Sequence, residues 1–301
     1  MLAIELCGIK LRNPTMLASG IMGTTAASLV RIARAGAGAV VTKSAGLVPR
    51  EGHRNPTVVE IEQGLLNAIG LANPGVAEFV QELREVSGTG VPVVASVYGL
   101  TIEEYAEAAR FVTKAGVAAI ELNLSCPNVE EAGAIFGADE ELAFQVVHLV
   151  RRATSLPVFA KLTANAGDVV AIAKACEDAG ADAITAINTL KAMAIDIRAR
   201  TPLLGNRVGG LSGQCIKPIA VRCVYEIARE VSVPVIGCGG ITTGRDAVEF
   251  LLAGARAVQI GTAVLTRGVS VFRKVSLEIK EYLEEMGYGS VDEIVGLAQR
   301  C

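Results

Sequence analysis

The sequence predicts an α/β protein with the architecture of a (β/α)8 TIM barrel, because two short phrases alternate along the chain and mark eight strands. In the first phrase, a helical pattern ends in Ala-Gly and a short apolar run follows. Its four occurrences lie around Gly36, Gly116, Gly180 and Gly254. In the second phrase, proline opens an apolar run. Its four occurrences lie at Pro14, Pro92, Pro157 and Pro234.

Both phrases have a physical reason to mark strands. Glycine just after the last helical residue adopts the left-handed conformation that ends a helix, so the run after it can extend. Proline lacks an N–H group, and this costs least at the first residue of a strand. Runs that are apolar at every position are typical of parallel strands buried on both faces.

Helical patterns fill most of the gaps between these strands. The segment 101–116 begins with a capping box from Thr101 to Glu104. Other segments with the period of an amphipathic helix are residues 139–155, 167–180, 244–254 and 269–287. An open doubly wound sheet is the alternative architecture. The eight strands, and the lack of a G-x-G-x-x-G motif after the first one, favour a closed barrel.

Three further segments complete the predicted single domain over residues 1–301. Residues 2–11 are expected to form an N-terminal hairpin cap at the end of the barrel opposite the active face. Two long loops, residues 47–73 and 190–218, follow the second and sixth strands at the C-terminal face. Since barrel enzymes build their active sites at this face, the two loops are expected to frame a functional site.

The composition excludes several function classes. Hydrophobic residues make up 51% of the 301 residues and the net charge is −3, so we expect a large core and no binding of nucleic acid. No apolar run is long enough for a membrane span, and the first residues lack the pattern of a signal peptide, so we expect a cytoplasmic protein. The seven cysteines form no C-x-x-C motif, so neither a metal site nor an iron–sulfur cluster is expected in this chain.

Polar side chains at the ends of the predicted strands are expected to converge in a barrel. Lys43 and Lys161 both end apolar strands and suggest an anionic or electron-rich cofactor, although a single lysine there more often only extends to solvent. The last two strands are followed by small residues that let backbone N–H groups approach a phosphate, namely Gly239, Gly240, Gly261 and Thr262. The alternative is that these glycines only form tight turns.

Amide side chains and one cysteine mark the remaining strand ends. Neutral donors and acceptors suited to a planar ligand are Asn67, Asn123, Asn128 and Asn188, although each alone is more often a turn residue. Cys126 lies between two of these asparagines, and nearby positive charge lowers a thiol pKa from its usual value of about 8.5. Cys126 is therefore a candidate base, the alternative being a small buried apolar residue.

Several of these stretches resemble dihydroorotate dehydrogenase. The motifs that carry the resemblance are "LLNAIGLANPG", "ELNLSCPNV", "INTLKAMAIDI", "GGLSG" followed by "IKP", "GCGGI" and "IGTA". They occur in the family's order over nearly the whole chain. The resemblance implies a (β/α)8 barrel that binds FMN and oxidises dihydroorotate to orotate in pyrimidine synthesis.

The resemblance also assigns residues, position by position. It implies that Cys126 is the catalytic base, which takes a proton from C5 while hydride leaves C6 for FMN. The implied substrate-binding residues are Asn67, Gly70, Leu71, Asn123, Asn128, Asn188 and Thr189. The implied FMN-binding residues are Ser19, Lys43, Asn123, Lys161, Gly213, Gly239, Gly240, Gly261 and Thr262.

The stretch at 187–218 is similar to class 1B of the family, the catalytic subunit of a heterotetramer built on a homodimer core. This class implies a partner subunit that carries FAD and a [2Fe–2S] cluster and passes electrons to NAD. Class 1A, a homodimer that uses fumarate, is the first alternative. Others are a related flavin barrel acting on dihydropyrimidines such as dihydrouracil, a Schiff-base aldolase with Lys161 as nucleophile, and a barrel without catalytic activity.

Overall fold

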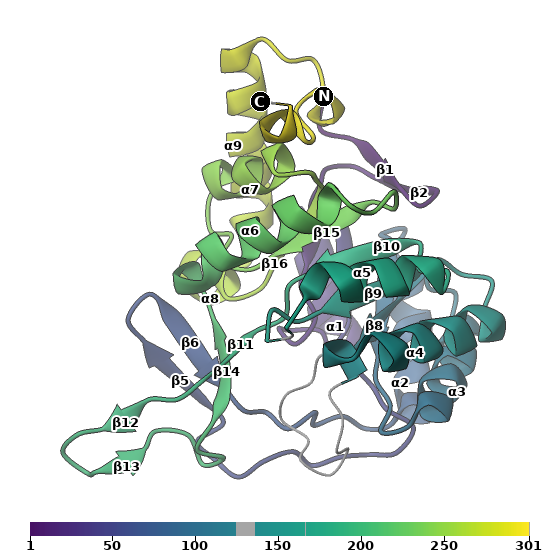
Figure 1. Cartoon of the computed structure of the whole chain (residues 1–301), viewed down its shortest axis with the longest axis vertical. Coiled ribbons are helices and arrows are strands. Elements are labelled where there is room, and N and C mark those ends of the chain that lie inside the picture. The colour runs from purple at the N-terminus through teal and green to yellow at the C-terminus, as the bar shows by residue number, and fades with distance from the viewer. Residues whose placement is uncertain (125–135, 166, 301) are drawn as a thin grey trace.

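Eight parallel strands close into a barrel at the centre of the computed structural model, which describes residues 1–124, 136–165 and 167–300 (Figure 1). In chain order the barrel strands are β3 (Thr15–Leu17), β4 (Ala39–Val41), β7 (Val93–Val97), β8 (Ala119–Asn123), β9 (Val158–Leu162), β10 (Ala183–Ala186), β15 (Val235–Cys238) and β16 (Ala255–Ile260). Each strand pairs with the next, and β16 pairs with β3 to close the ring. The eight strands predicted from the two phrases are confirmed.

The residues at the strand starts behave as the phrases predict. The glycines at the ends of the preceding helices all have positive φ, with 117° at Gly36, 78° at Gly116, 98° at Gly180 and 114° at Gly254. Of the strands that follow, β4, β8 and β10 are buried along their whole length, and β16 is buried except at Arg256. The barrel core therefore consists of small and branched apolar side chains from both faces of the sheet.

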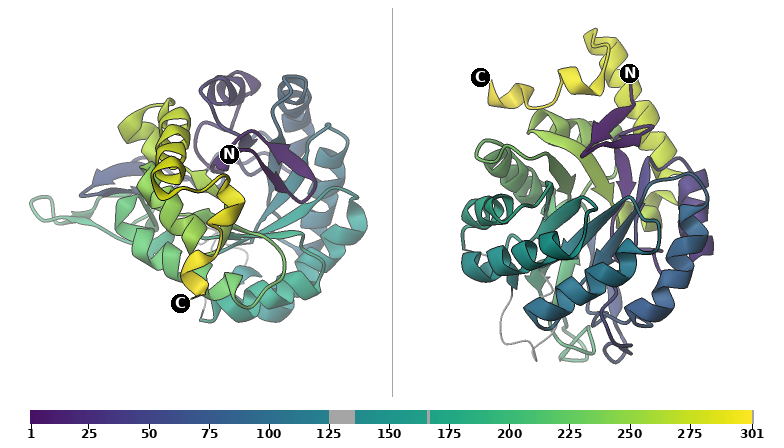
Figure 2. Two further views of the ribbon diagram at one scale, coloured as in Figure 1. Left: turned by 90° about the horizontal axis from the view of Figure 1, so that it is seen from above. Right: turned by 90° about the vertical axis from the view of Figure 1, so that its right-hand side faces the viewer.

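Helices surround the barrel, as both views of Figure 2 show. They are α1 (Ala26–Arg34), α2 (Val76–Ser87), α3 (Ile102–Thr113), α4 (Glu140–Ala153), α5 (Val169–Asp178), α6 (Lys217–Ala228), α7 (Gly244–Leu252), α8 (Ala263–Arg267) and α9 (Val271–Met286). Short 3-10 turns occupy Phe136–Ala138, Gln214–Ile216, Val291–Glu293 and Leu297–Gln299. All five helical segments predicted above are present.

Only half of the capping box predicted at α3 forms. The Thr101 hydroxyl accepts a hydrogen bond from the Glu104 N–H at 3.3 Å, as predicted. The Glu104 carboxylate accepts instead from the N–H of Leu100, at 2.6 Å. The helix start is still satisfied, because the carboxylate stabilises an N–H group one residue earlier.

The predicted N-terminal hairpin is confirmed. Strands β1 (Ile4–Leu6) and β2 (Ile9–Leu11) pair antiparallel. Cys7 and Gly8 connect them, with φ of 50° and 79°, as a two-residue hairpin turn with two left-handed positions requires. The Cys7 thiol donates a hydrogen bond to the carbonyl of Asp182, just before β10, so the hairpin covers the amino-terminal end of the barrel.

The two long loops build one antiparallel sheet, which the sequence did not reveal. The first contributes β5 (Val58–Ile61) and β6 (Gly64–Asn67), and the second contributes β11 (Leu190–Ala192) and β14 (Gly209–Ser212), in the order β11-β14-β6-β5. A further pair, β12 (Ile195–Asp196) and β13 (Thr201–Pro202), projects away from the barrel (Figure 1). Leu66, Ala68 and Leu204 form a small separate core beneath the sheet.

Candidate active site

A cavity of about 910 Å³ opens at the carboxyl ends of the barrel strands, next to the four-stranded sheet. Its wall includes every candidate residue that lies in the described part of the chain. These are Ser19, Lys43, Asn67, Gly70, Leu71, Asn123, Lys161, Asn188, Thr189, Gly213, Gly239, Gly240, Gly261 and Thr262. Cys126 and Asn128 lie outside the described residues. The fold therefore brings together side chains that are up to 243 positions apart, from Ser19 to Thr262.

One side of the cavity is a glycine cradle in which a larger residue would not fit. Gly239 and Gly240 have φ of 134° and 77°, which glycine adopts without strain. A Cβ atom on Gly240 would lie 2.6 Å from the Cβ of Lys217 and 2.9 Å from the carbonyl oxygen of Gly213. The backbone at this point is therefore close-packed on one side and faces the cavity on the other.

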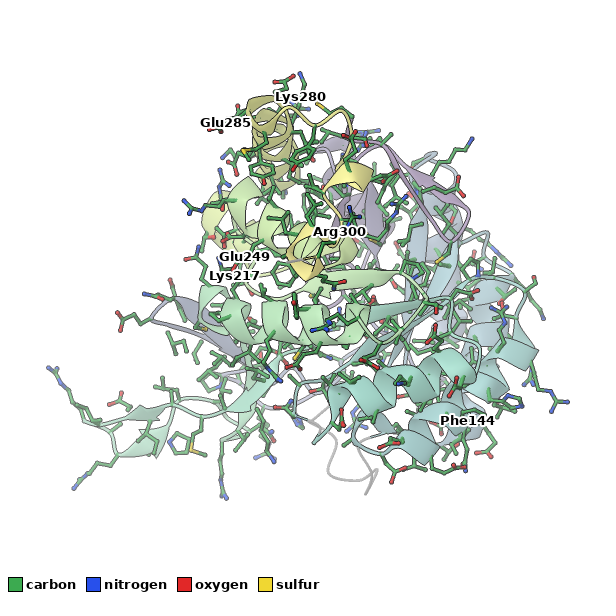
Figure 3. The ribbon with its side chains drawn as sticks, turned by 45° about the horizontal axis from the view of Figure 1, so that its top comes forward. Phe144, Lys217, Glu249, Lys280, Glu285 and Arg300 are labelled. Carbon is green, nitrogen blue, oxygen red and sulfur yellow. The ribbon has the colours of Figure 1, made fainter. Side chains whose placement is uncertain are left out.

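Ion pairs behind the cradle fix its position. Lys217 begins α6, and its ammonium lies 2.8 Å from Asp246 and 2.7 Å from Glu249, both on α7. Figure 3 shows the side chains of Lys217 and Glu249 meeting between the two helices. On the neighbouring strand, the Thr262 hydroxyl donates to the hydroxyl of Ser212 at 2.8 Å and so connects the end of β16 to β14.

Lys161 lies on the cavity wall and is 4% exposed. Its ammonium donates to the side-chain oxygen of Gln259 at 2.7 Å and lies 3.4 Å from the Glu121 carboxylate. Burial is the largest single effect and lowers the pKa of Lys161, but the combined effects of Glu121 and, to a smaller degree, Cys238 outweigh burial and leave the pKa above its ordinary value. Lys161 is therefore a fixed positive charge at neutral pH, whereas burial raises the pKa of the neighbouring Cys238 thiol and keeps it neutral.

Glu121 and Gln259, the partners of Lys161, were not predicted from the sequence. Both lie within strands that otherwise read as apolar, β8 and β16, and both are buried. A signal was present, because Glu121 is two residues before Asn123 and so faces the same side of the strand. A carboxylate inside a buried strand needs a partner, and the predicted strand-end lysine was one.

The amide side chains of Asn123 and Asn188 form a connected network at the same end of the barrel, and Asn123 lies beside Lys161 on the neighbouring strand. The Asn188 amide donates to the Asn123 carbonyl oxygen at 3.2 Å, and the Asn123 amide donates to the Ser44 hydroxyl at 3.1 Å. The N–H of Thr189 donates to the Asn188 side chain at 2.8 Å. On the first long loop, Asn67 donates to the carbonyl of Gly210 at 3.1 Å. These bonds fix donors and acceptors in one orientation, as a planar polar ligand requires.

Asn73 holds the loop that carries Gly70 and Leu71, and it too was not predicted from the sequence. Its side-chain oxygen accepts from the N–H groups of Gly46 and Gly75, at 3.3 and 2.9 Å. Its amide donates to the Leu71 carbonyl at 2.8 Å and to the Tyr98 hydroxyl at 2.9 Å. All four hydrogen-bonding positions of the amide group are in use, and they hold Leu71 at its left-handed φ of 58°.

The described part of the chain contains neither a helix that could span a membrane nor a cluster of metal-binding side chains. None of its helices is long and apolar enough to cross a membrane. Within residues 1–124, 136–165 and 167–300, no three acidic, histidine or cysteine side chains gather in a way that could hold a metal ion.

Comparison with known proteins gives consistent results. A family model described as dihydroorotate dehydrogenase matches residues 1–283. The protein named dihydroorotate dehydrogenase B (NAD(+)), catalytic subunit, from Pyrococcus furiosus is 52% identical over 297 residues, which is 99% of this chain and 98% of that protein. The protein of the same name from Methanothermobacter thermautotrophicus is 52% identical over 300 residues, with 99% and 98% covered.

A solved structure supports the fold independently. The crystal structure of DHODH from Eimeria tenella in complex with ferulenol matches with a TM-score of 0.87 and covers 100% of this chain and 89% of that one. At 22% identity this likeness shows the fold alone, and it confirms the predicted barrel.

Proposed function

Because the chain belongs to the dihydroorotate dehydrogenase family, we propose that it oxidises dihydroorotate to orotate in pyrimidine synthesis, as the catalytic subunit of an NAD-linked enzyme. The family resemblance found in the motifs is confirmed, and the relatives' names favour class 1B over the fumarate-linked and dihydropyrimidine alternatives. The observation that carries the proposal is the cavity, whose wall includes every described residue that the resemblance assigns.

We infer that the cofactor is FMN. The glycine cradle at Gly239 and Gly240 suits a single phosphate, and a Cβ atom at Gly240 would disturb it. Lys161 supplies a fixed positive charge elsewhere on the same wall, suited to the pyrimidine edge of a flavin. When bound, FMN supplies the hydride acceptor. Lys43, Ser19, Gly213, Gly261 and Thr262 complete the proposed contacts.

We assign the substrate to the amide network. Asn67, Asn123, Asn188 and Thr189 present donors and acceptors that their own hydrogen bonds already orient. Cys126 follows Asn123 by three residues, and we assign it as the base that takes the C5 proton as hydride leaves C6. Asn128 and the backbone at Gly70 and Leu71 complete the proposed substrate contacts.

The proposal is tested with the purified chain and a dye as electron acceptor. Dihydroorotate should reduce the dye and yield orotate, while dihydrouracil, which lacks the carboxylate, should not. Equal rates with both compounds would support the dihydropyrimidine alternative instead. A colourless protein that forms a borohydride-trapped adduct at Lys161 would support the aldolase.

The hydrogen bonds by which Asn73 holds its loop give a prediction about substrate binding. Asn73→Ala removes four hydrogen bonds from the loop at Gly70 and Leu71, each worth about 1 kcal/mol net, so we expect orotate to bind about 10- to 100-fold more weakly. FMN content should stay unchanged. The matched control is Asn206→Ala, because Asn206 bonds the carbonyl of Val208 within the second long loop. Unchanged orotate affinity in Asn73→Ala would contradict the assignment of this loop.

Reduced FMN must pass its electrons to an acceptor, and this requirement gives a prediction about the partner subunit. We propose a cytoplasmic heterotetramer in which a homodimer of this chain binds subunits carrying FAD and a [2Fe–2S] cluster. The chain alone should then reduce dyes with dihydroorotate but not NAD, and addition of the partner subunit should confer NAD reduction. Rapid NAD reduction by the chain alone would contradict the need for a partner, and fumarate reduction would place it in class 1A.

A further inference from the structure

A buried carboxylate lies beneath the cavity and has no role in the mechanism above. Glu121 on β8 is 0% exposed and makes polar contacts with Gln259, Thr185 and Lys161. One oxygen accepts hydrogen bonds from the Gln259 amide at 2.5 Å and the Thr185 hydroxyl at 3.1 Å. The other accepts no hydrogen bond from the described residues and faces the Lys161 ammonium at 3.4 Å.

Gln259 connects the two charged groups. Its side-chain oxygen accepts from Lys161 at 2.7 Å, while its amide donates to Glu121. The amide group therefore cannot rotate without losing both bonds. The ammonium is held from one side by Glu121 and Gln259, and the side chain reaches the cavity wall on the other.

We propose that Glu121 is a positioning residue for Lys161, which with Gln259 fixes the ammonium at one point of the cavity wall and keeps it charged before any ligand enters. The inference rests on the proposed function, since FMN is the ligand that Lys161 would face. A buried charge persists only when it is paired, and Glu121 is the paired group in this layer of the barrel.

Among the groups around Lys161, Glu121 is the one that supplies a negative charge. The groups that shift the pKa of Lys161 are Glu121 from β8 and Cys238 from β15. Cys238 is neutral at neutral pH, because burial raises its thiol pKa. Gln259 from β16 and Thr185 from β10 are uncharged. Without Glu121, burial would dominate, and buried lysines without a counter-charge have pKa values of about 5–6.

Glu121→Gln tests this directly, because it keeps the shape of the side chain and removes its charge. Lys161 should then be neutral while FMN is oxidised and should regain its proton once reduction brings negative charge to the site. At pH 7.5, we expect Glu121→Gln to take up one more proton per FMN reduced than the unaltered chain does. The measurement is electrochemical reduction of the bound flavin in weak buffer with a pH indicator.

Thr185→Val is the matched control, since it removes one hydrogen bond from Glu121 and keeps the charge. Its proton count should equal that of the unaltered chain. A role limited to packing would lower the melting temperature of both variants and change neither count. An unchanged count in Glu121→Gln would overturn the proposal.

A second measurement needs no flavin and separates this inference from the proposed function. The melting temperature is compared for Glu121→Gln, Lys161→Met and the double variant. In Glu121→Gln the buried lysine must give up its proton on folding, whereas the double variant has no lysine to deprotonate, so it should be more stable than Glu121→Gln alone. A double variant less stable than both single variants would overturn the pairing. A chain that purifies without FMN would refute the proposed function, while this comparison would still test Glu121.

Discussion

Replacing Cys126 with alanine is expected to lower turnover of dihydroorotate by about 10²- to 10⁴-fold, the usual contribution of a general base. FMN and orotate should still bind, because the glycine cradle and the amide network are untouched. The measurement is the rate at which dihydroorotate bleaches the flavin without oxygen, together with the dissociation constant of orotate. Near-normal bleaching in Cys126→Ala would refute the assignment.

Two further variants sharpen this prediction. Cys126→Ser should recover part of the activity only at higher pH, because an alcohol is a far weaker acid than a thiol. Cys7→Ala is the control, since Cys7 lies in the hairpin at the opposite end of the barrel. Its turnover should stay normal. A similar loss of turnover in both alanine variants would mean that the effect of Cys126→Ala is not specific to its position.

Gly240→Asp is expected to abolish FMN binding. The new carboxylate would stand against the phosphate, and its Cβ would lie 2.6 Å from the Cβ of Lys217. The φ of 77° adds backbone strain for any residue other than glycine. The measurement is the flavin content of the purified protein, with circular dichroism to confirm the fold.

Gly287→Asp is a matched control for the strain. Gly287 has a φ of 78° and lies at the end of α9, where an added Cβ atom would meet no other atom within 4 Å. Gly287→Asp therefore has the same backbone strain as Gly240→Asp, but it causes no steric clash and lies away from the proposed phosphate site. This variant should keep its FMN. Full flavin content in Gly240→Asp would contradict the placement of the phosphate at this cradle.

The barrel could be predicted from the sequence because its signals are local. Each strand start carries its own proline, or its own helix-ending glycine such as Gly116, and eight such signals define the fold class. Strand-end residues such as Lys43 and Asn188 could then be placed in one cavity, since parallel strands of a barrel end on the same face.

The sheet over the cavity could not be predicted, because its pairing is not local. Gly210 pairs with Asn67, and the two segments are short, partly exposed and far apart in the sequence. No periodicity within either segment reveals the register. The role of Asn73 could not be predicted for a similar reason, since its four hydrogen bonds reach three different loops. Glu121 and Gln259 were hidden within apolar strands.

The central claim is that this chain binds FMN and passes hydride from dihydroorotate to it. The most direct test is an anaerobic titration of the purified chain, without any partner subunit, with dihydroorotate while the flavin absorbance is followed. We predict one FMN per chain and full bleaching at one equivalent of dihydroorotate, with one orotate formed. A protein that carries FMN but is not bleached by excess dihydroorotate, or one that carries FAD, would contradict the account.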